Sequence, residues 1–121
     1  MIRRPSHAAL AGLLLLPLAA NAAGDGPQLW GYGVQGCERF LQAAAAQEAA
    51  AGDAAGMEFQ RYQDWLTGFI SGLSLATGED VLRGSSIASA MRRNQAYCRD
   101  YPNADFFNAT MDFVRLLRTL N

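Results

Sequence analysis

Cys37 and Cys98 are the side chains with the most definite chemistry in this 121-residue chain, because they are its two cysteines. Neither belongs to a Cys-x-x-Cys pair, which argues against a catalytic redox role. In an oxidising compartment two cysteines most simply form one disulfide, whereas the alternative is two free thiols buried as small hydrophobic side chains. A bridge across this interval of about 60 residues would stabilise the fold by about 4 kcal/mol in the chain-entropy model.

The first 22 residues indicate which compartment the chain occupies. Arg3 and Arg4 form a short positive start, an apolar run follows over residues 8–20, and Ala20-Asn21-Ala22 fits the small-x-small cleavage rule. We therefore predict a signal peptide over residues 1–22 and export to the periplasm of a Gram-negative bacterium. The run is too short for a comfortable transmembrane span, and no later stretch stays apolar for about 18 residues, so stable membrane insertion is not expected.

The composition after residue 22 excludes several classes of site. Eight arginines and eleven acidic residues remain there, which gives a formal net charge of −3, and there is no lysine or histidine. Without histidine, Ser-His and Cys-His nucleophile systems and histidine metal ligands are excluded, and without lysine so are Schiff bases. A net negative chain without a basic stripe is also a poor nucleic-acid binder.

Carboxylates are the plentiful acid–base groups that remain, but their spacing predicts no catalytic pair. Glu79 and Asp80 are adjacent and would point apart on a regular element. Glu58 and Asp64 do not share a helix face. No Glu-x-x-His or Asp-x-Asp pattern offers a metal site. We therefore expect a solvated acidic surface, with no metal, no cofactor and no enzymatic activity.

Arg92, Arg93 and Arg99 form the other charged group that could do chemistry, because together they could bind an anion. Arginines on an exposed helix face more often pair with nearby carboxylates, here Asp100 or Asp105, at little net gain. We expect the second arrangement.

Hydrophobic periodicity predicts an all-α domain over residues 35–121, with no sustained period-2 alternation. Residues 23–34 are glycine-rich and should form a flexible arm, with Trp30 and Tyr32 anchored on the body. The first helix should begin between residues 34 and 37 and end before a loop at 52–56. The second carries an apolar stripe from 59 to 73 and ends at Gly78, a plausible left-handed cap. The third helix should run from residue 85 or 86 to about residue 100, and the fourth should begin at residue 103 or 105.

The second helix also supplies a candidate interaction surface. Gly68 and Gly72 lie on one side of it, and each costs about 1 kcal/mol relative to alanine. We expect another backbone to approach them closely, either within the chain or across a dimer, because the flanks are too polar for a membrane dimer motif. An exposed aromatic patch would likewise mark a partner surface. The whole candidate surface comprises Tyr62, Trp65, Gly68, Phe69, Gly72, Glu79 and Asp80.

Four features occur in order after the predicted signal peptide: Cys-Glu-Arg-Phe-Leu (37–41), Trp-Leu-Thr-Gly-Phe-Ile-Ser-Gly (65–72), Tyr-Cys-Arg-Asp-Tyr-Pro (97–102) and a final amphipathic helix. This layout resembles the HdeA/HdeB family of small periplasmic acid-stress chaperones over residues 35–118. The resemblance implies a small orthogonal four-helix bundle with a single disulfide between Cys37 and Cys98.

The resemblance also implies a function. Members of the family are folded dimers near neutral pH that dissociate and partly unfold in acid, and the exposed apolar surface then holds unfolded client proteins. The composition is compatible with this behaviour, because eleven carboxylates would protonate between about pH 5 and 3 and take the net charge from −3 toward +8.

A second hypothesis comes from a different class of protein. Immunity proteins or inhibitors of exported toxins, such as the Rap/Tai type, are also small, exported and helical and contain a disulfide. In that case the candidate surface would bind one specific protein partner instead of many unfolded clients.

Overall fold

The computed structural model describes residues 2–3, 12, 26–50 and 52–120. The predicted signal peptide, apart from positions 2, 3 and 12, and residues 23–25 of the predicted arm lie outside the described residues. A short 3-10 helix, η1 (Gly31–Val34), is followed by α1 (Cys37–Glu48), α2 (Asp53–Thr77), α3 (Ile87–Asp100) and α4 (Phe106–Thr119). The prediction of an all-helical domain with four helices is confirmed for the described part of the chain.

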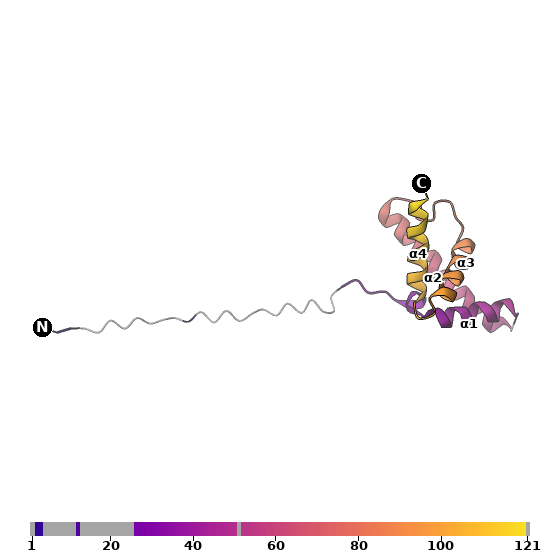
Figure 1. Ribbon diagram of the computed structural model, residues 1–121, viewed down its shortest axis with the longest axis horizontal. Helices are drawn as coiled ribbons and strands as arrows, with labels where there is room; N and C mark the ends of the chain where they lie inside the picture. The colour runs from indigo at the N-terminus through magenta and orange to yellow at the C-terminus, as the bar shows by residue number, and fades with distance from the viewer. Residues whose placement is uncertain (1, 4–11, 13–25, 51, 121) are drawn as a thin grey trace.

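The four helices pack in two directions. Figure 1 shows α3 and α4 side by side in front of α2, with α1 lying across the lower end of the body and the C-terminus at the opposite end. The closest packing is between α3 and α4, between α1 and α2, and between α1 and α3.

Three capping residues begin and end the helices where the sequence predicts. The Ser86 hydroxyl accepts a hydrogen bond from the Ser89 backbone N–H at the start of α3, at 3.0 Å. The Asp105 carboxylate accepts one from the Asn108 backbone N–H at the start of α4, at 2.7 Å. Gly78, with φ of 72°, ends α2 in the left-handed conformation.

The loop predicted at 52–56 is wrong, because α2 already begins at Asp53. The turn is completed at Gly52, whose φ of 101° is one that glycine adopts readily. Ala54 and Ala55 then continue as helix, because alanine has the highest helix propensity, and Gly56 is carried inside the first turns.

The disulfide between Cys37 and Cys98 forms as predicted and is fully buried, so it joins the first residue of α1 to the last turn of α3. Beside it, one aromatic ring from each of α1, α2 and α4 meets the others. The Phe40 and Phe106 ring centroids lie 4.6 Å apart, and the Tyr62 centroid lies 5.0 Å from Phe40 and 5.1 Å from Phe106. All four helices therefore converge on this aromatic cluster and the disulfide.

Tyr62 carries the one polar atom of that cluster and generates a prediction. Its hydroxyl is buried with no hydrogen-bond partner in the described structure. Burial raises the pKa of Tyr62 to about 12, and the nearby Glu58 carboxylate adds to the effect. An unfolded tyrosine titrates near pH ~10, so this contribution to stability is complete below pH ~10 and is lost as the pH rises toward 12.

We expect Tyr62→Phe to unfold less readily than the wild type between pH ~10 and 12, because the ionising group is gone. At pH 7 it should be at least as stable as the wild type, since an unpaired buried hydroxyl costs about 1–3 kcal/mol. Urea unfolding at both pH values tests this, with the exposed Tyr101→Phe as the matched control. A clear loss of stability in Tyr62→Phe at pH 7 would contradict the unsatisfied hydroxyl.

Candidate functional site

Half-buried apolar side chains run along the boundary between α2 and α4. Trp65, Phe69 and Leu73 follow one another at intervals of four on α2, and Phe107 and Met111 do so on α4. The Trp65 and Phe69 rings stack with centroids 5.0 Å apart, and Phe107 meets the Phe69 ring edge-on at 5.6 Å. We call these five side chains the α2–α4 seam.

The seam is open on one side because α2 and α4 approach each other through side chains and have few close backbone contacts. Beneath it, Leu66 and Phe106 are fully buried in the core. At the end near the C-terminus, a cavity of about 70 Å³ lies between Leu73, Val81 and Met111. It has room for the end of one aliphatic side chain, and Glu79, Arg83 and Arg118 contribute to its walls.

The segment containing η1 closes the opposite end of the seam. Gly33 lies directly on the Trp65 indole, so closely that a β-carbon at this position would overlap the ring. The indole N–H donates a hydrogen bond to the Trp30 carbonyl at 2.9 Å. The Tyr32 hydroxyl donates to the Glu58 carboxylate at 3.1 Å and accepts from Arg61 at 3.3 Å.

The end of the predicted arm is therefore folded onto the body as η1. Tyr32 is an anchor as predicted, with its ring edge-on to Tyr62 at 4.7 Å. The prediction for Trp30 is wrong, because this residue is 76% exposed. Its contact with the body is the hydrogen bond that its backbone carbonyl accepts from the Trp65 indole. The physical reason is that glycine backbone, not a second aromatic ring, covers Trp65.

Three carboxylates hold the borders of the seam. Glu58 accepts the hydrogen bond that holds Tyr32 of η1. Asp80 accepts bonds from the backbone N–H groups of Leu82 and Gly84, at 3.0 and 2.8 Å, and so fixes the turn beside the cavity. Asp105 caps α4 at the end that carries Phe107. Hydrogen bonds to an ionised acceptor are stronger than neutral ones, so each border depends on a negative charge.

The predicted interaction surface is only partly on the surface. Trp65 and Phe69 belong to the seam, but Tyr62 is fully buried beneath other aromatic rings and is not available to a partner. A tyrosine in the apolar stripe of a helix faces the core. Its position in the stripe decides its burial, even though the hydroxyl is polar.

The remaining predicted residues lie further along α2. Gly68 and Gly72 are exposed, and nothing lies within 4 Å of a β-carbon built on either, so the close backbone approach expected for them is absent within the described chain. An approach by a second chain stays a prediction. Glu79 and Asp80 follow the end of α2, where Glu79 pairs with Arg83 at 3.8 Å.

Three members of the seam are absent from the predicted interaction surface: Leu73, which was predicted only as part of the apolar stripe of the second helix, and Phe107 and Met111. The spacing of four between Phe107 and Met111 on an amphipathic helix was the available signal, but they sit at the edge of the α4 stripe, about 100° and about 140° from Phe106. Whether a residue at the edge of a stripe is buried or exposed depends on where the neighbouring helix packs.

The predicted pairing of Arg92, Arg93 and Arg99 with carboxylates is not found. In the described part of the chain the ion pairs are Arg61–Glu58 at 3.6 Å and Arg83–Glu79 at 3.8 Å. Asp105 instead serves as the α4 cap.

Within the described residues, no three acidic, histidine or cysteine side chains gather where they could hold a metal ion. None of the described helices combines the length and apolar character that crossing a membrane requires. No family model, curated protein or solved structure matches the chain.

The contact between Gly33 and Trp65 gives a prediction about the border of the seam. Gly33→Ala should destabilise the protein by about 1–3 kcal/mol, because the indole or η1 must move. Gly72→Ala, in open space on α2, should instead stabilise it by up to about 1 kcal/mol. Urea unfolding followed by Trp65 fluorescence in a Trp30→Phe background measures both changes. A neutral Gly33→Ala would contradict the seating of η1 on Trp65.

Proposed function

We propose that this is a small exported, non-enzymatic protein, similar to HdeA and HdeB, that binds unfolded proteins under acid stress. The observation that carries the proposal is the α2–α4 seam, a band of half-buried aromatic and methionine side chains whose borders are held by carboxylates.

Acid would weaken the borders of the seam. Protonation removes the negative charge of Glu58, Asp80 and Asp105, and with it the charge-assisted hydrogen bonds that hold η1, the 80–84 turn and the start of α4. The loss of all carboxylate charges also leaves a strongly positive chain that repels itself. The buried Cys37–Cys98 bond is indifferent to pH in this range, so it would keep α1 on α3 while the seam opens.

The seam suits clients of many sequences. Its members offer flat aromatic surface and one flexible thioether, Met111, which adapts to differently shaped apolar groups. Apolar segments of a client would pack between α2 and α4 without needing a specific polar partner.

One observation favours the second candidate, a protein that binds one specific partner at neutral pH. Leu75 is 85% exposed on α2, beside the open faces of Gly68 and Gly72. This surface is already available without acid, so it fits a preformed interface of the kind an immunity protein or toxin inhibitor would use.

The proposal is tested by light scattering of an acid-denatured model enzyme at pH ~3 and at pH 7. We expect suppression of aggregation at pH ~3 alone, and a several-fold loss of this protection in Phe69→Ala/Phe107→Ala. Leu75→Ala, a truncation on α2 outside the seam, should keep it. Circular dichroism at pH 7 confirms that each variant folds.

Trp65 provides an independent measurement. In the Trp30→Phe background, acrylamide quenching of Trp65 should rise between pH 7 and pH ~3 if η1 lifts from the indole. A protein that stays compact and inert at pH ~3 would refute the acid function. A single stoichiometric partner captured at pH 7, lost in Leu75→Asp, would then support the second candidate.

A further inference from the structure

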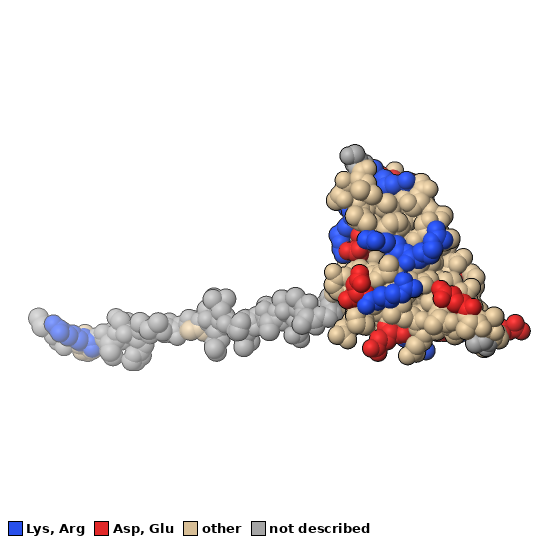
Figure 2. Space-filling view, turned by 45° about the vertical axis from the view of Figure 1, so that its right-hand side comes forward, with Lys and Arg blue, Asp and Glu red and all other residues tan. Residues whose placement is uncertain are grey.

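Charge is divided between the two halves of the fold. Residues 26–80, which form η1, α1 and α2, hold two arginines and seven acidic residues, whereas residues 81–120, which contain α3 and α4, hold six arginines and three aspartates. Figure 2 shows blue side chains in a band across the middle of the body, with most of the red ones in its lower half. Charge is therefore unevenly distributed along the chain, which its small net charge conceals.

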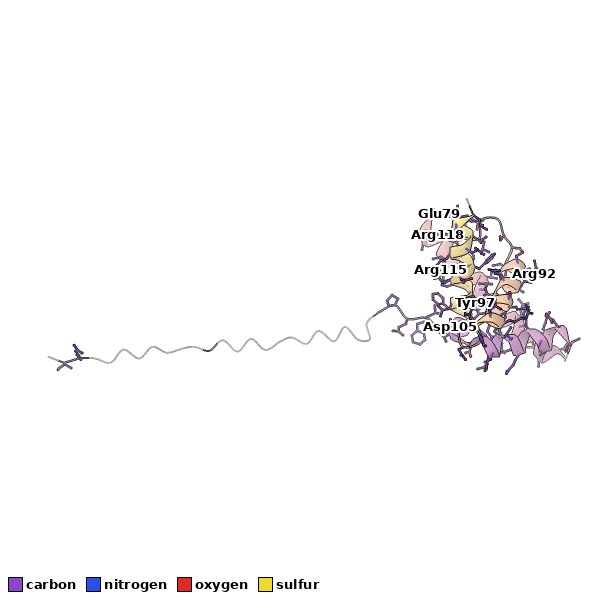
Figure 3. All side chains as sticks on the ribbon, viewed as in Figure 1. Glu79, Arg92, Tyr97, Asp105, Arg115 and Arg118 are labelled. Carbon is purple, nitrogen blue, oxygen red and sulfur yellow. A yellow bond between two sulfur atoms is a disulfide. The ribbon has the colours of Figure 1, made fainter. Side chains whose placement is uncertain are left out.

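Five of these arginines lie exposed on α3 and α4, and we call them the arginine face: Arg92, Arg93, Arg99, Arg115 and Arg118. Figure 3 places Arg92 on α3 and Arg115 and Arg118 on neighbouring turns of α4. None of the five forms an ion pair within the described residues. Arg92 donates a hydrogen bond to the Ser89 hydroxyl at 3.0 Å, which leaves its charge uncompensated.

Exposed leucines accompany these charges. Leu116 is 36% exposed and Leu120 is 68% exposed, on the same last turns of α4 that carry Arg115 and Arg118. Cationic groups beside exposed aliphatic side chains are typical of surfaces that lie in the headgroup region of an anionic bilayer. A bilayer offers the leucines an apolar phase directly behind its anionic headgroups, whereas an acidic protein offers one only where an apolar patch adjoins its carboxylates.

We propose that the arginine face docks peripherally on an anionic phospholipid surface. The guanidinium groups would bind lipid phosphates, for which their planar pairs of donors are suited, and Leu116 and Leu120 would enter the interface. The acidic residues of α1 and of the start of α2, Glu38, Glu48 and Asp53, would be repelled by the same surface and so would turn away from it, whereas Glu79 lies near Arg118 at the other end of α2. The docking is independent of the proposed chaperone function and needs no acid.

The test is sedimentation of the protein at pH 7 with vesicles of phosphatidylcholine alone or with about a third phosphatidylglycerol. We expect binding to the anionic vesicles at about 50 mM salt, at least tenfold weaker binding to the neutral ones, and loss of binding near 500 mM salt. Arg92→Gln/Arg115→Gln should weaken binding about tenfold or more, since each basic residue near such a surface contributes several-fold.

Matched variants distinguish a lipid surface from an acidic macromolecule as the partner. Arg39→Glu makes the same change in net charge on the acidic half and should alter binding less than twofold. Leu116→Ser/Leu120→Ser keeps the charge and should weaken binding several-fold. No binding to anionic vesicles at about 50 mM salt, or an equal loss in Arg39→Glu, overturns the proposal. It is also overturned if the leucine variant binds normally and soluble polyglutamate competes fully, because the partner is then an acidic macromolecule.

Discussion

The bond between Cys37 and Cys98 is the constraint on which the rest of the fold depends. α1 buries little beyond Cys37, Phe40 and two alanines, so its own packing holds it weakly. Two backbone hydrogen bonds flank the bridge, from Cys37 to the Ala104 carbonyl at 2.9 Å and from Phe106 to the Gln35 carbonyl at 3.0 Å. The bridge and these bonds fix the entry to α1 against the entry to α4. A stabilisation of about 4 kcal/mol is a large share of the roughly 5–15 kcal/mol typical of a domain.

With the core held at that junction, the fold can leave α2 and α4 separated at their outer edges. The seam is the product of this arrangement, and a carboxylate hydrogen bond helps to hold each of its borders, together with the packing of Gly33 on Trp65 at the η1 end. The stable part and the adjustable part of the molecule are therefore built from different interactions, one covalent and aromatic, the other electrostatic. Charge is divided in a different way, between the segment with η1, α1 and α2, which is acidic, and the segment with α3 and α4, which carries most of the arginines.

The sequence predicts features that depend on neighbours along the chain. Ser86, Asp105 and Gly78 begin or end helices through bonds to residues a few positions away, and they lie where expected. Features set by contacts between helices were missed or misplaced. Trp65 is covered by Gly33 and not by the Trp30 ring. Gly72 faces open space because none of the other described helices packs against that side of α2. The arginine face needed the fold as well, because Arg92 and Arg115 stand on different helices and total charge does not reveal that α3 and α4 lie side by side.

The position of the two cysteines sets an order of events during synthesis. Cys37 opens α1, and Cys98 lies in the last turn of α3, 61 residues later. The first thiol must therefore wait, unpaired, until α2 and α3 have been made. Since residues 37 and 98 are the two cysteines of the chain, oxidation within it cannot choose a wrong partner. The hazard lies between molecules, where two waiting thiols can join two unfinished chains, so yield in an oxidising compartment should fall as the concentration of nascent protein rises.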